Sequence, residues 1–211
     1  MELDLHIHTH RYSGCSNIPP EKLLQQARAA GLDGIAITEH GIRWSDRDIA
    51  ELKDKAGMTD FTVIAGQEIA CYGADGRFEG EFLVFGYPQS LGSSKSARLA
   101  TDIVHAAGGV MIAAHPFKRM KNGSGFYGSG LTTLEIAVDG LEVEHPDYDG
   151  EGRSMARILM KSMGVAGIGA SDAHELRHVG RCRTVFERNI TTCEMLCEEI
   201  RRCRLQAVRN F

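Results

Sequence analysis

Residues Asp4-Leu5-His6-Ile7-His8-Thr9 form a mostly apolar run that carries two histidines near its end. A turn over residues 13–19 follows, and then a helical segment over residues 20–30 that Gly31 closes. The chain therefore begins with a strand, a loop and a helix. Side chains two positions apart on a strand point the same way, so His6 and His8 can bind one ion side by side.

The same pattern of strand and helix recurs along the rest of the chain. Further strands are predicted over residues 34–38, 61–70, 109–114, 141–143, 165–169 and 184–187. Further helices are predicted over residues 44–56, 94–107, 132–138, 152–163 and 191–203, with a hairpin around residues 73–87. This alternation predicts one α/β domain over residues 1–211 with a mostly parallel sheet. The phosphate-binding sequences of open sheets, GxGxxG and GxxxxGKS, are absent after the strands, which favours a closed barrel.

Composition and charge narrow the class of protein. The chain has 211 residues, 43% of them hydrophobic and 25% charged, which is typical of an ordinary globular protein and excludes disordered and fibrous classes. Its 24 basic and 28 acidic residues give a net charge of -4, which argues against a general nucleic-acid coat protein and favours a small partner. The acidic start and the lack of a long apolar run predict a cytoplasmic protein without a membrane span, and most of its six cysteines are expected to be reduced.

Histidines and carboxylates gather at the predicted strand ends. The histidines in question are His6, His8, His40, His115, His145 and His174. Glu68 and Asp172 occupy similar places. In an α/β barrel these strand ends meet on one face, where imidazoles and carboxylates together suit Zn²⁺, Mn²⁺ or Fe²⁺. Taken singly, His115 or His145 is more simply a hydrogen-bonded core residue, but six coincident positions favour a metal site.

Six short motifs, in this order along the chain, resemble those of the PHP family, named for polymerase and histidinol phosphatase domains. They are Asp4-Leu5-His6-Ile7-His8-Thr9, Thr38-Glu39-His40, Gly66-Gln67-Glu68, Ala114-His115-Pro116-Phe117, Glu142-Val143-Glu144-His145 and Ser171-Asp172-Ala173-His174. The resemblance implies a distorted barrel of seven βα units. It also implies two or three divalent metal ions, bound at the C-terminal ends of the strands, and hydrolysis of phosphate esters.

The resemblance also implies a set of metal ligands. His6, His8, Glu68 and Asp172 resemble the ligands of one ion, and Glu68 resembles a bridge to a second ion. His115 and His145 complete the second set, and His40 with His174 resemble a third. The family usually has an Asp or His a few residues after the HxH motif, whereas this chain has Ser13-Gly14-Cys15. Cys15 is either a thiolate ligand or a turn residue without a ligating role.

The chemistry expected of such a centre is hydrolytic. A water that bridges two cations loses its proton near neutral pH, and the hydroxide can attack phosphorus while the ions neutralise the phosphoryl oxygens. Asp172 and His174 are the candidate proton carriers, with His174 a general acid only where no third ion occupies it. Arg11, Lys118 and Arg181 are the candidate phosphate-binding side chains, although each taken singly is more simply a solvated surface charge. The glycine-rich residues 122–128 are either a lid whose aromatic side chains cover the ester or a flexible connection.

Three functions remain open from the sequence. The favoured one is a phosphoesterase that acts on a small phosphomonoester or a nucleotide-like phosphodiester. A nuclease or proofreading module is the second, which the negative net charge and the lack of a basic stripe disfavour. The third is a domain whose metals only brace a partner-binding fold. The sequence indicates neither the ester, the metal nor the oligomeric state.

Overall fold

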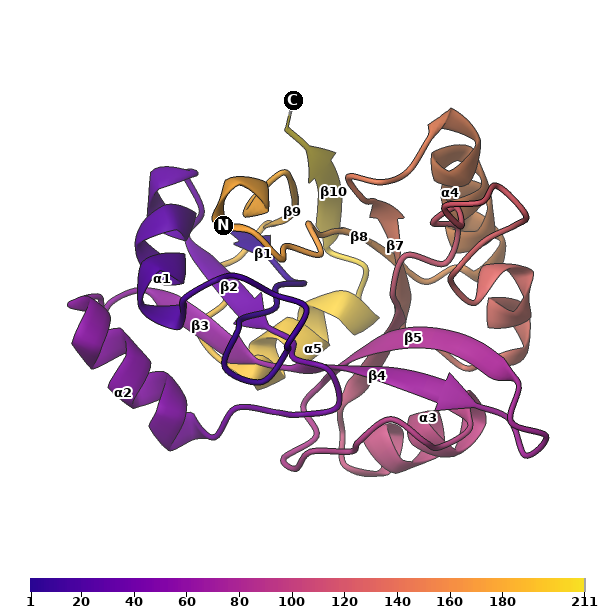
Figure 1. Cartoon of the computed structure of the whole chain (residues 1–211), viewed down its shortest axis with the longest axis horizontal. Coiled ribbons are helices and arrows are strands. Elements are labelled where there is room, and N and C mark those ends of the chain that lie inside the picture. Colours follow the sequence, from indigo (N-terminus) through magenta and orange to yellow (C-terminus); the bar gives the residue numbers. More distant parts are fainter. Residues whose placement is uncertain (211) are drawn as a thin grey trace.

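A computed structural model of the chain describes residues 1–210. Within these residues, ten strands form two five-stranded sheets, and α-helices cover their outer faces (Figure 1). The first sheet has the order β10-β9-β1-β2-β3, with strands Leu205–Arg209, Cys182–Phe186, Glu2–Asp4, Gly34–Ile37 and Thr62–Ala65. The second has the order β4-β5-β6-β7-β8, with strands Gln67–Tyr72, Phe78–Phe85, Val110–Ala113, Gly140–Glu144 and Ala166–Gly169.

The helices follow the predicted order. The α-helices are α1 Pro20–Ala29, α2 Asp46–Ala56, α3 Ala97–Ala106, α4 Gly150–Met163 and α5 Cys193–Arg201. The two short 3₁₀-helices are η1 Gly130–Glu135 and η2 Leu176–His178. Local chemistry sets their ends: the Ser45 hydroxyl accepts the backbone N–H of Asp48 at the start of α2, and Gly57 ends that helix in the left-handed conformation.

The prediction of an α/β fold is confirmed, but the ladders of residues 1–210 do not close into one seven-unit barrel. Parallel pairing joins β1, β2 and β3, and also β6, β7 and β8, as the strand–helix alternation predicts. The β4–β5 hairpin and the antiparallel strands β9 and β10 interrupt that alternation. At the seams, isolated bridges pair His40 with Glu68 and Ile7 with Ala173.

Three elements differ from the sequence prediction. The single strand predicted over residues 61–70 is divided at Gly66 into β3 and β4, which belong to different sheets. The predicted helix over residues 132–138 is the shorter η1, because the chain becomes extended at Ile136. Strand β10 was not predicted: the chain reverses at Cys203, which has a positive φ of 52°, and then pairs with β9 along its whole length. This pairing with β9 is a long-range contact that local periodicity does not reveal.

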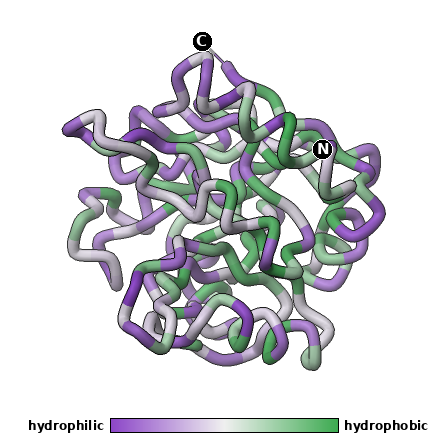
Figure 2. The backbone as a smooth tube through the Cα atoms, turned by 90° about the vertical axis from the view of Figure 1, so that its right-hand side faces the viewer, coloured by the Kyte–Doolittle hydropathy of each residue, from purple (hydrophilic) through white to green (hydrophobic). Residues whose placement is uncertain are grey.

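One buried cluster joins the two sheets, and two others lie between each sheet and its helices. Leu3 and Ile64 of the first sheet belong to the same buried cluster as Leu83, Ile112 and Ile168 of the second. Hydrophobic segments accordingly concentrate in the interior of the trace, and hydrophilic segments lie toward its edge (Figure 2). No helix within residues 1–210 has both the length and the hydrophobicity that crossing a membrane requires.

Gly66 allows the chain to pass from β3 into β4, and we expect Gly66→Ala to destabilise the protein. A Cβ at this position would lie 2.4 Å from Cε1 of the buried Phe85 and 3.0 Å from Cγ2 of Thr38. Overpacking of this kind costs about 1–3 kcal/mol, which urea unfolding would measure. Gly150→Ala is the matched control, because a Cβ there meets nothing within 4 Å. Equal stability of the two variants would contradict this prediction.

Candidate metal centre

The first two histidines of the site lie on an extended segment that follows β1. The backbone N–H of His8 donates to the carbonyl of Ala173 at 3.0 Å, and the N–H of Ala173 donates to the carbonyl of His6 at 3.2 Å. Leu5 and Ile7, which alternate with these histidines, are fully buried in the hydrophobic core. The period of two along an extended chain therefore directs both imidazoles to the same side, as predicted.

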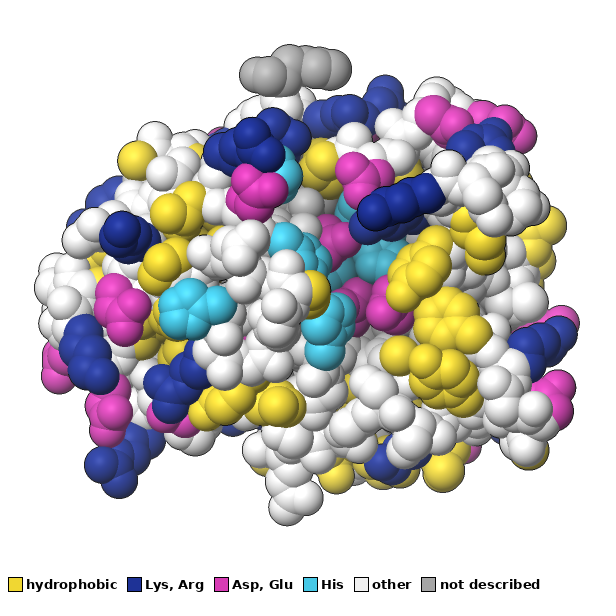
Figure 3. Space-filling model, in the orientation of Figure 1, with side chains coloured by type: hydrophobic (Ala, Val, Ile, Leu, Met, Phe, Trp, Pro, Cys, Tyr) yellow, Lys and Arg dark blue, Asp and Glu magenta, His cyan; other side chains and the backbone are white. Residues whose placement is uncertain are grey.

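The other predicted ligands come from five further positions. Glu68 lies on β4, and His40, His115, His145 and the pair Asp172 and His174 follow β2, β6, β7 and β8. Histidine and acidic side chains gather at a hollow in the middle of one face of the molecule (Figure 3). The structure thus brings all eight predicted metal ligands together, and the distances below describe how they face one another.

Two of these residues adopt unusual backbone conformations. His115 has a φ of 28° and Asp172 a φ of 47°, and residues other than glycine rarely adopt a positive φ. Buried hydrogen bonds hold both segments: the N–H of His115 donates to Glu142 at 2.6 Å, and Ser171 donates its N–H to Asp4 at 3.0 Å. Strain of this kind is characteristic of functional sites, where surrounding contacts maintain it.

His6, His8, Glu68 and Asp172 form the centre of the cluster. Nε2 of His6 lies 3.3 Å from Oε1 of Glu68 and 3.5 Å from Oδ1 of Asp172. Nε2 of His8 lies 3.3 Å from Oε2 of Glu68 and 3.5 Å from the same Asp172 oxygen. Ligand atoms that share one tetrahedral zinc are separated by roughly 3.4 Å. The spacing of these four side chains therefore suits a single ion.

A second group surrounds His115 and includes a carboxylate that the sequence analysis missed. Nε2 of His115 lies 3.1 Å from Oε1 of Glu68 and 3.5 Å from Oε2 of Glu81. Glu81 lies on β5, opposite Ala70, which places it diagonally across the hairpin from Glu68. Only the hairpin register reveals this proximity, because Glu81 does not follow a strand end.

A third group combines His8, His40 and His174, whose ligand atoms lie within 4.8 Å of one another. Sγ of Cys15 lies 3.3 Å from Nε2 of His40, so the cysteine that follows the HxH motif is at the edge of this group. The hydroxyl of Ser13, two residues before Cys15, lies 3.3 Å from Nδ1 of His8. Cys15 thus lies where the PHP pattern expects an Asp or His.

The charges of this cluster depend on one another. Burial acts to lower the pKa of His6, but the carboxylates of Glu68 and Asp172 outweigh it and raise that pKa well above its usual value. Burial acts to raise the pKa of Glu68, yet His6 and the other imidazoles lower it well below its usual range. Burial and the charge of Glu68 together raise the pKa of Glu81. The buried carboxylates therefore require positive charge beside them.

Comparison with known proteins identifies the family. The sequence profile of the PHP domain matches residues 4–121, more than half of the chain. The chain belongs to the PHP domain family. A second profile, described as PHP-associated, matches residues 150–205. The matched segments include seven of the eight predicted ligands; His145 lies between them. No curated protein in the comparison matches the sequence.

Solved structures share the fold of this PHP domain. A two-domain protein from Bacteroides vulgatus, containing a predicted PHP-like metal-dependent phosphoesterase, has a TM-score of 0.74 at 19% identity. The match covers 100% of this chain and 65% of that one, so the chain spans about two thirds of that relative. A protein from Bifidobacterium adolescentis, assigned as a metal-dependent phosphoesterase, has a TM-score of 0.66 at 20% identity over 94% of both chains. A lesion-specific endonuclease from Pyrococcus furiosus has a TM-score of 0.60 at 16% identity, over 95% of this chain and 55% of that one.

The donors of the cluster fit the divalent metals that PHP membership implies. Nδ1 of His6 faces the carboxylate of Glu142 at 2.8 Å and donates to it, which leaves the Nε2 lone pair directed at Glu68 and Asp172. Two acceptors that face each other in a buried site need a cation or a proton between them. His145 differs from His6, because its Nδ1 accepts the backbone N–H of Asp147 at 3.1 Å, and the neutral ring then carries its proton on Nε2. This buried Nε2 faces Oδ2 of Asp172 at 3.5 Å.

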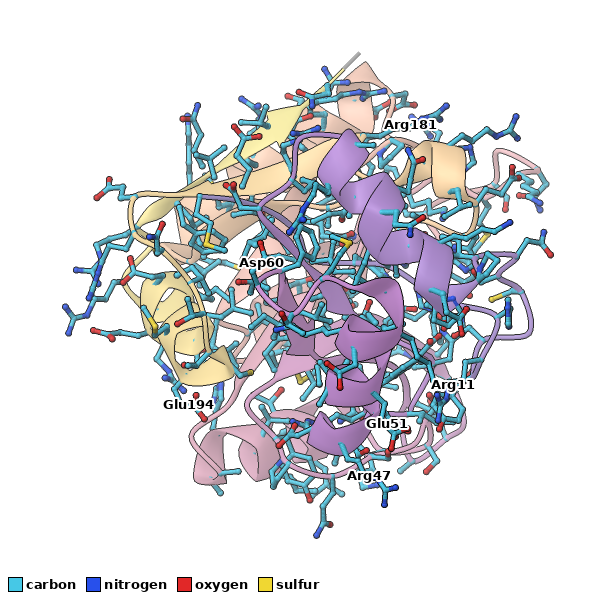
Figure 4. The ribbon with its side chains drawn as sticks, turned by 90° about the vertical axis from the view of Figure 1, so that its left-hand side faces the viewer. Arg11, Arg47, Glu51, Asp60, Arg181 and Glu194 are labelled. Atoms are coloured by element: carbon cyan, nitrogen blue, oxygen red, sulfur yellow. The ribbon has the colours of Figure 1, made fainter. Side chains whose placement is uncertain are left out.

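The three predicted phosphate-binding residues lie in different places. Nζ of Lys118 lies in the hollow, 2.9 Å from Oδ2 of Asp172. Arg11 pairs with Asp48 at 2.7 Å and lies over the ring of Trp44, and Arg181 lines a separate hollow. Figure 4 shows Arg11 and Arg181 well apart on one side of the molecule. The structure thus brings only Lys118 of these three to the metal ligands.

Proposed function

We propose that this PHP domain is a metal-dependent hydrolase of phosphate esters. The observation that carries this proposal is the shared position of Glu68 and Asp172, whose carboxylates face six imidazoles and line the hollow that also contains Lys118. The substrate class is a small phosphomonoester or a nucleotide-like phosphodiester. We further propose that residues 1–211 act as one catalytic domain, because the ligands come from both ends of the chain.

The proposed ligand sets follow the three groups. His6, His8, Glu68 and Asp172 would bind one ion, and Glu68 with His115, His145 and the newly recognised Glu81 would bind a second. His40 and His174, with His8 and Cys15 beside them, would bind a third. Bound Zn²⁺, Mn²⁺ or Fe²⁺ would supply Lewis acidity that neutralises charge on the phosphoryl oxygens and makes a nucleophile available at neutral pH.

Two side chains of the protein have roles of their own. Nδ1 of His174 donates to the backbone carbonyl of Asp172 at 2.9 Å, which leaves Nε2 of His174 with a lone pair. That nitrogen can bind an ion or move a proton to and from the leaving oxygen. Lys118 is two-thirds or more buried, and it directs its ammonium group toward the same carboxylate that faces the imidazoles. It is therefore positioned to bind a phosphoryl oxygen.

We expect Lys118→Ala to lower kcat/KM by about 10–100-fold, mostly through KM, because a charge-assisted hydrogen bond to the phosphate is lost. Initial rates, measured with a phosphate ester at concentrations up to saturation of the enzyme, would give this change. Elemental analysis should show unchanged metal content. Lys118→Arg should restore part of the loss. Lys22→Ala, which removes an exposed lysine of α1, is the control and should behave like the unmodified protein. Wild-type KM in Lys118→Ala would contradict the assignment.

The experiment that tests the proposed function has two parts. Protein purified without chelator is analysed for zinc, manganese and iron, and it is then screened for phosphate release and diester cleavage over a panel of esters. Less than one equivalent of metal, together with no hydrolysis after reconstitution, would favour the partner-binding function instead. Robust cleavage of single-stranded DNA would favour the nuclease function, which the fold similarity to the Pyrococcus endonuclease supports.

A further inference from the structure

A row of three aromatic side chains begins at the edge of the metal centre. The ring centroid of Tyr127 lies 6.1 Å from that of His115, and the ring of Phe78 lies 5.5 Å from Tyr127. The ring of Tyr72 follows at 5.6 Å from Phe78. We call Tyr127, Phe78 and Tyr72 the aromatic row. Tyr127 also extends its hydroxyl to within 3.4 Å of the Glu81 carboxylate, which joins the row to the second ligand group.

Backbone structure fixes each ring of the aromatic row. Tyr127 donates its N–H to the carbonyl of Lys118 at 2.7 Å, and Met120 donates to Gly125 at 2.9 Å, so the glycine-rich segment forms a small hairpin. Tyr72 and Phe78 are a cross-strand pair of β4 and β5. The row is therefore built on paired strands at both ends and needs no rearrangement to present its rings.

The row is more exposed than aromatic side chains of a core would be. Tyr127 is 44% exposed and Tyr72 is 38% exposed. Tyr127 lines the metal hollow, which has a volume of about 550 Å³, together with Met120, itself 41% exposed. Hydrophobic side chains accordingly form a patch directly beside the histidine and acidic cluster (Figure 3). This patch is the wall against which the non-phosphate part of a substrate would lie.

Neither side of the row carries a continuous run of positive charge. Lys118, Arg119 and Lys121 line the metal hollow together with three carboxylates, Glu68, Glu81 and Asp172. A second hollow of about 470 Å³, which Phe78 lines, has two arginines and two glutamates, Glu79 and Glu135. The cations beside the metal ligands can therefore contact one phosphate, but the two hollows form no basic stripe along the row. This distribution suits one phosphoester next to one flat group, and not a long strand with a phosphate at every step.

We propose that the substrate is a nucleoside phosphoester whose base stacks on the aromatic row while its phosphate lies among the metal ligands. This inference rests on the proposed function and specifies its substrate class. A sugar phosphate without a ring base would leave the three rings in water. A base stacked on an aromatic side chain, by contrast, contributes enough binding to favour its ester at least about tenfold.

The first test compares esters that differ only in the base. Metal-loaded protein is assayed with adenosine 5′-phosphate against ribose 5-phosphate, and with the methyl diesters of the same two compounds. Whichever class is hydrolysed, monoester or methyl diester, we expect kcat/KM to be at least about tenfold higher for its adenosine compound than for its ribose compound. Phe78→Leu keeps an apolar side chain but removes the ring, and it should reduce this preference to about twofold. Ile158→Ala removes an exposed apolar side chain of α4 and is the control, in which the preference should remain.

The second test measures binding without turnover. Phe78→Trp places an indole in the aromatic row, and its fluorescence is followed while adenosine 5′-thiophosphate or thiophosphate is added to metal-loaded protein. Saturable quenching by the nucleoside compound alone supports the inference. Equal hydrolysis of adenosine and ribose esters, with no effect of Phe78→Leu, overturns the inference and leaves the proposed function intact. If no phosphate ester is hydrolysed, the proposed function fails, and absence of quenching would then overturn the inference as well.

Discussion

Glu68→Ala is expected to reduce hydrolysis of phosphate esters by at least about 10³-fold and to release bound metal. Four imidazoles face this carboxylate, as many as face Asp172. One of its oxygens lies 3.3 Å from Nε2 of His6 and 3.1 Å from Nε2 of His115. The other lies 3.3 Å from Nε2 of His8 and 3.0 Å from Nδ1 of His40. Its removal therefore takes a shared ligand from the first two proposed groups and the carboxylate that faces His40 of the third.

Metal content and rate must change together for this explanation to hold. Elemental analysis of the purified variant should show at least one equivalent less metal than the unmodified protein, and circular dichroism should show a retained fold. Glu51→Ala is the control: Glu51 pairs with Arg47 at the outer surface of α2 (Figure 4), and neither residue lines the hollow. Glu68→Ala protein that keeps full metal content and wild-type rates would exclude Glu68 as a ligand.

The part of the fold that follows from local sequence was predicted. Parallel strands alternate with amphipathic helices, and each has a periodicity that a single sequence reveals, as in α2, where Ile49 and Leu52 face inward. Long-range antiparallel pairing was not predicted. The β4–β5 register and the pairing of β10 with β9 depend on contacts between distant residues, so the two sheets and their seams could not be deduced.

At the candidate site, too, features set by local periodicity were predicted and features set by pairing between distant residues were missed. His6 and His8 were predicted because strand periodicity fixes the direction of adjacent side chains, and Asp172 with His174 because their motif follows a strand. Glu81 was missed because its approach to Glu68 depends on hairpin register. The aromatic row was missed for the same reason, since Phe78 meets Tyr127 only in the folded chain. The metal-ligand and catalytic roles themselves remain predictions, of which Glu68→Ala tests one ligand.

Asp4 holds the segment that carries Asp172, although the sequence analysis gave Asp4 no role. It is fully buried, and it accepts the N–H of Ser171 at 3.0 Å and the N–H of Gly180 at 2.8 Å. The Ser171 hydroxyl donates to it as well. Asp4 thereby connects β1 to the turn that holds Asp172 in its unusual conformation, with a φ of 47°. Asp4 is thus a positioning residue for a proposed metal ligand.

Asp4→Ala is expected to lower the free energy of unfolding by about 3–5 kcal/mol, because buried N–H groups lose their acceptor and a cavity remains. Urea unfolding in the presence of a chelator measures this loss without a contribution from bound metal. The folded variant should also bind metal about 10–100-fold more weakly, since the backbone of Asp172 is no longer fixed.

Asp4→Asn keeps one acceptor oxygen and should show an intermediate loss of both stability and metal affinity. Asp102→Ala, which removes an exposed carboxylate of α3, is the control and should leave both quantities unchanged. A stability loss in Asp4→Ala without any loss of metal affinity would show that Asp4 only supports the fold. Loss of both, with partial recovery in Asp4→Asn, is the result that a positioning role requires.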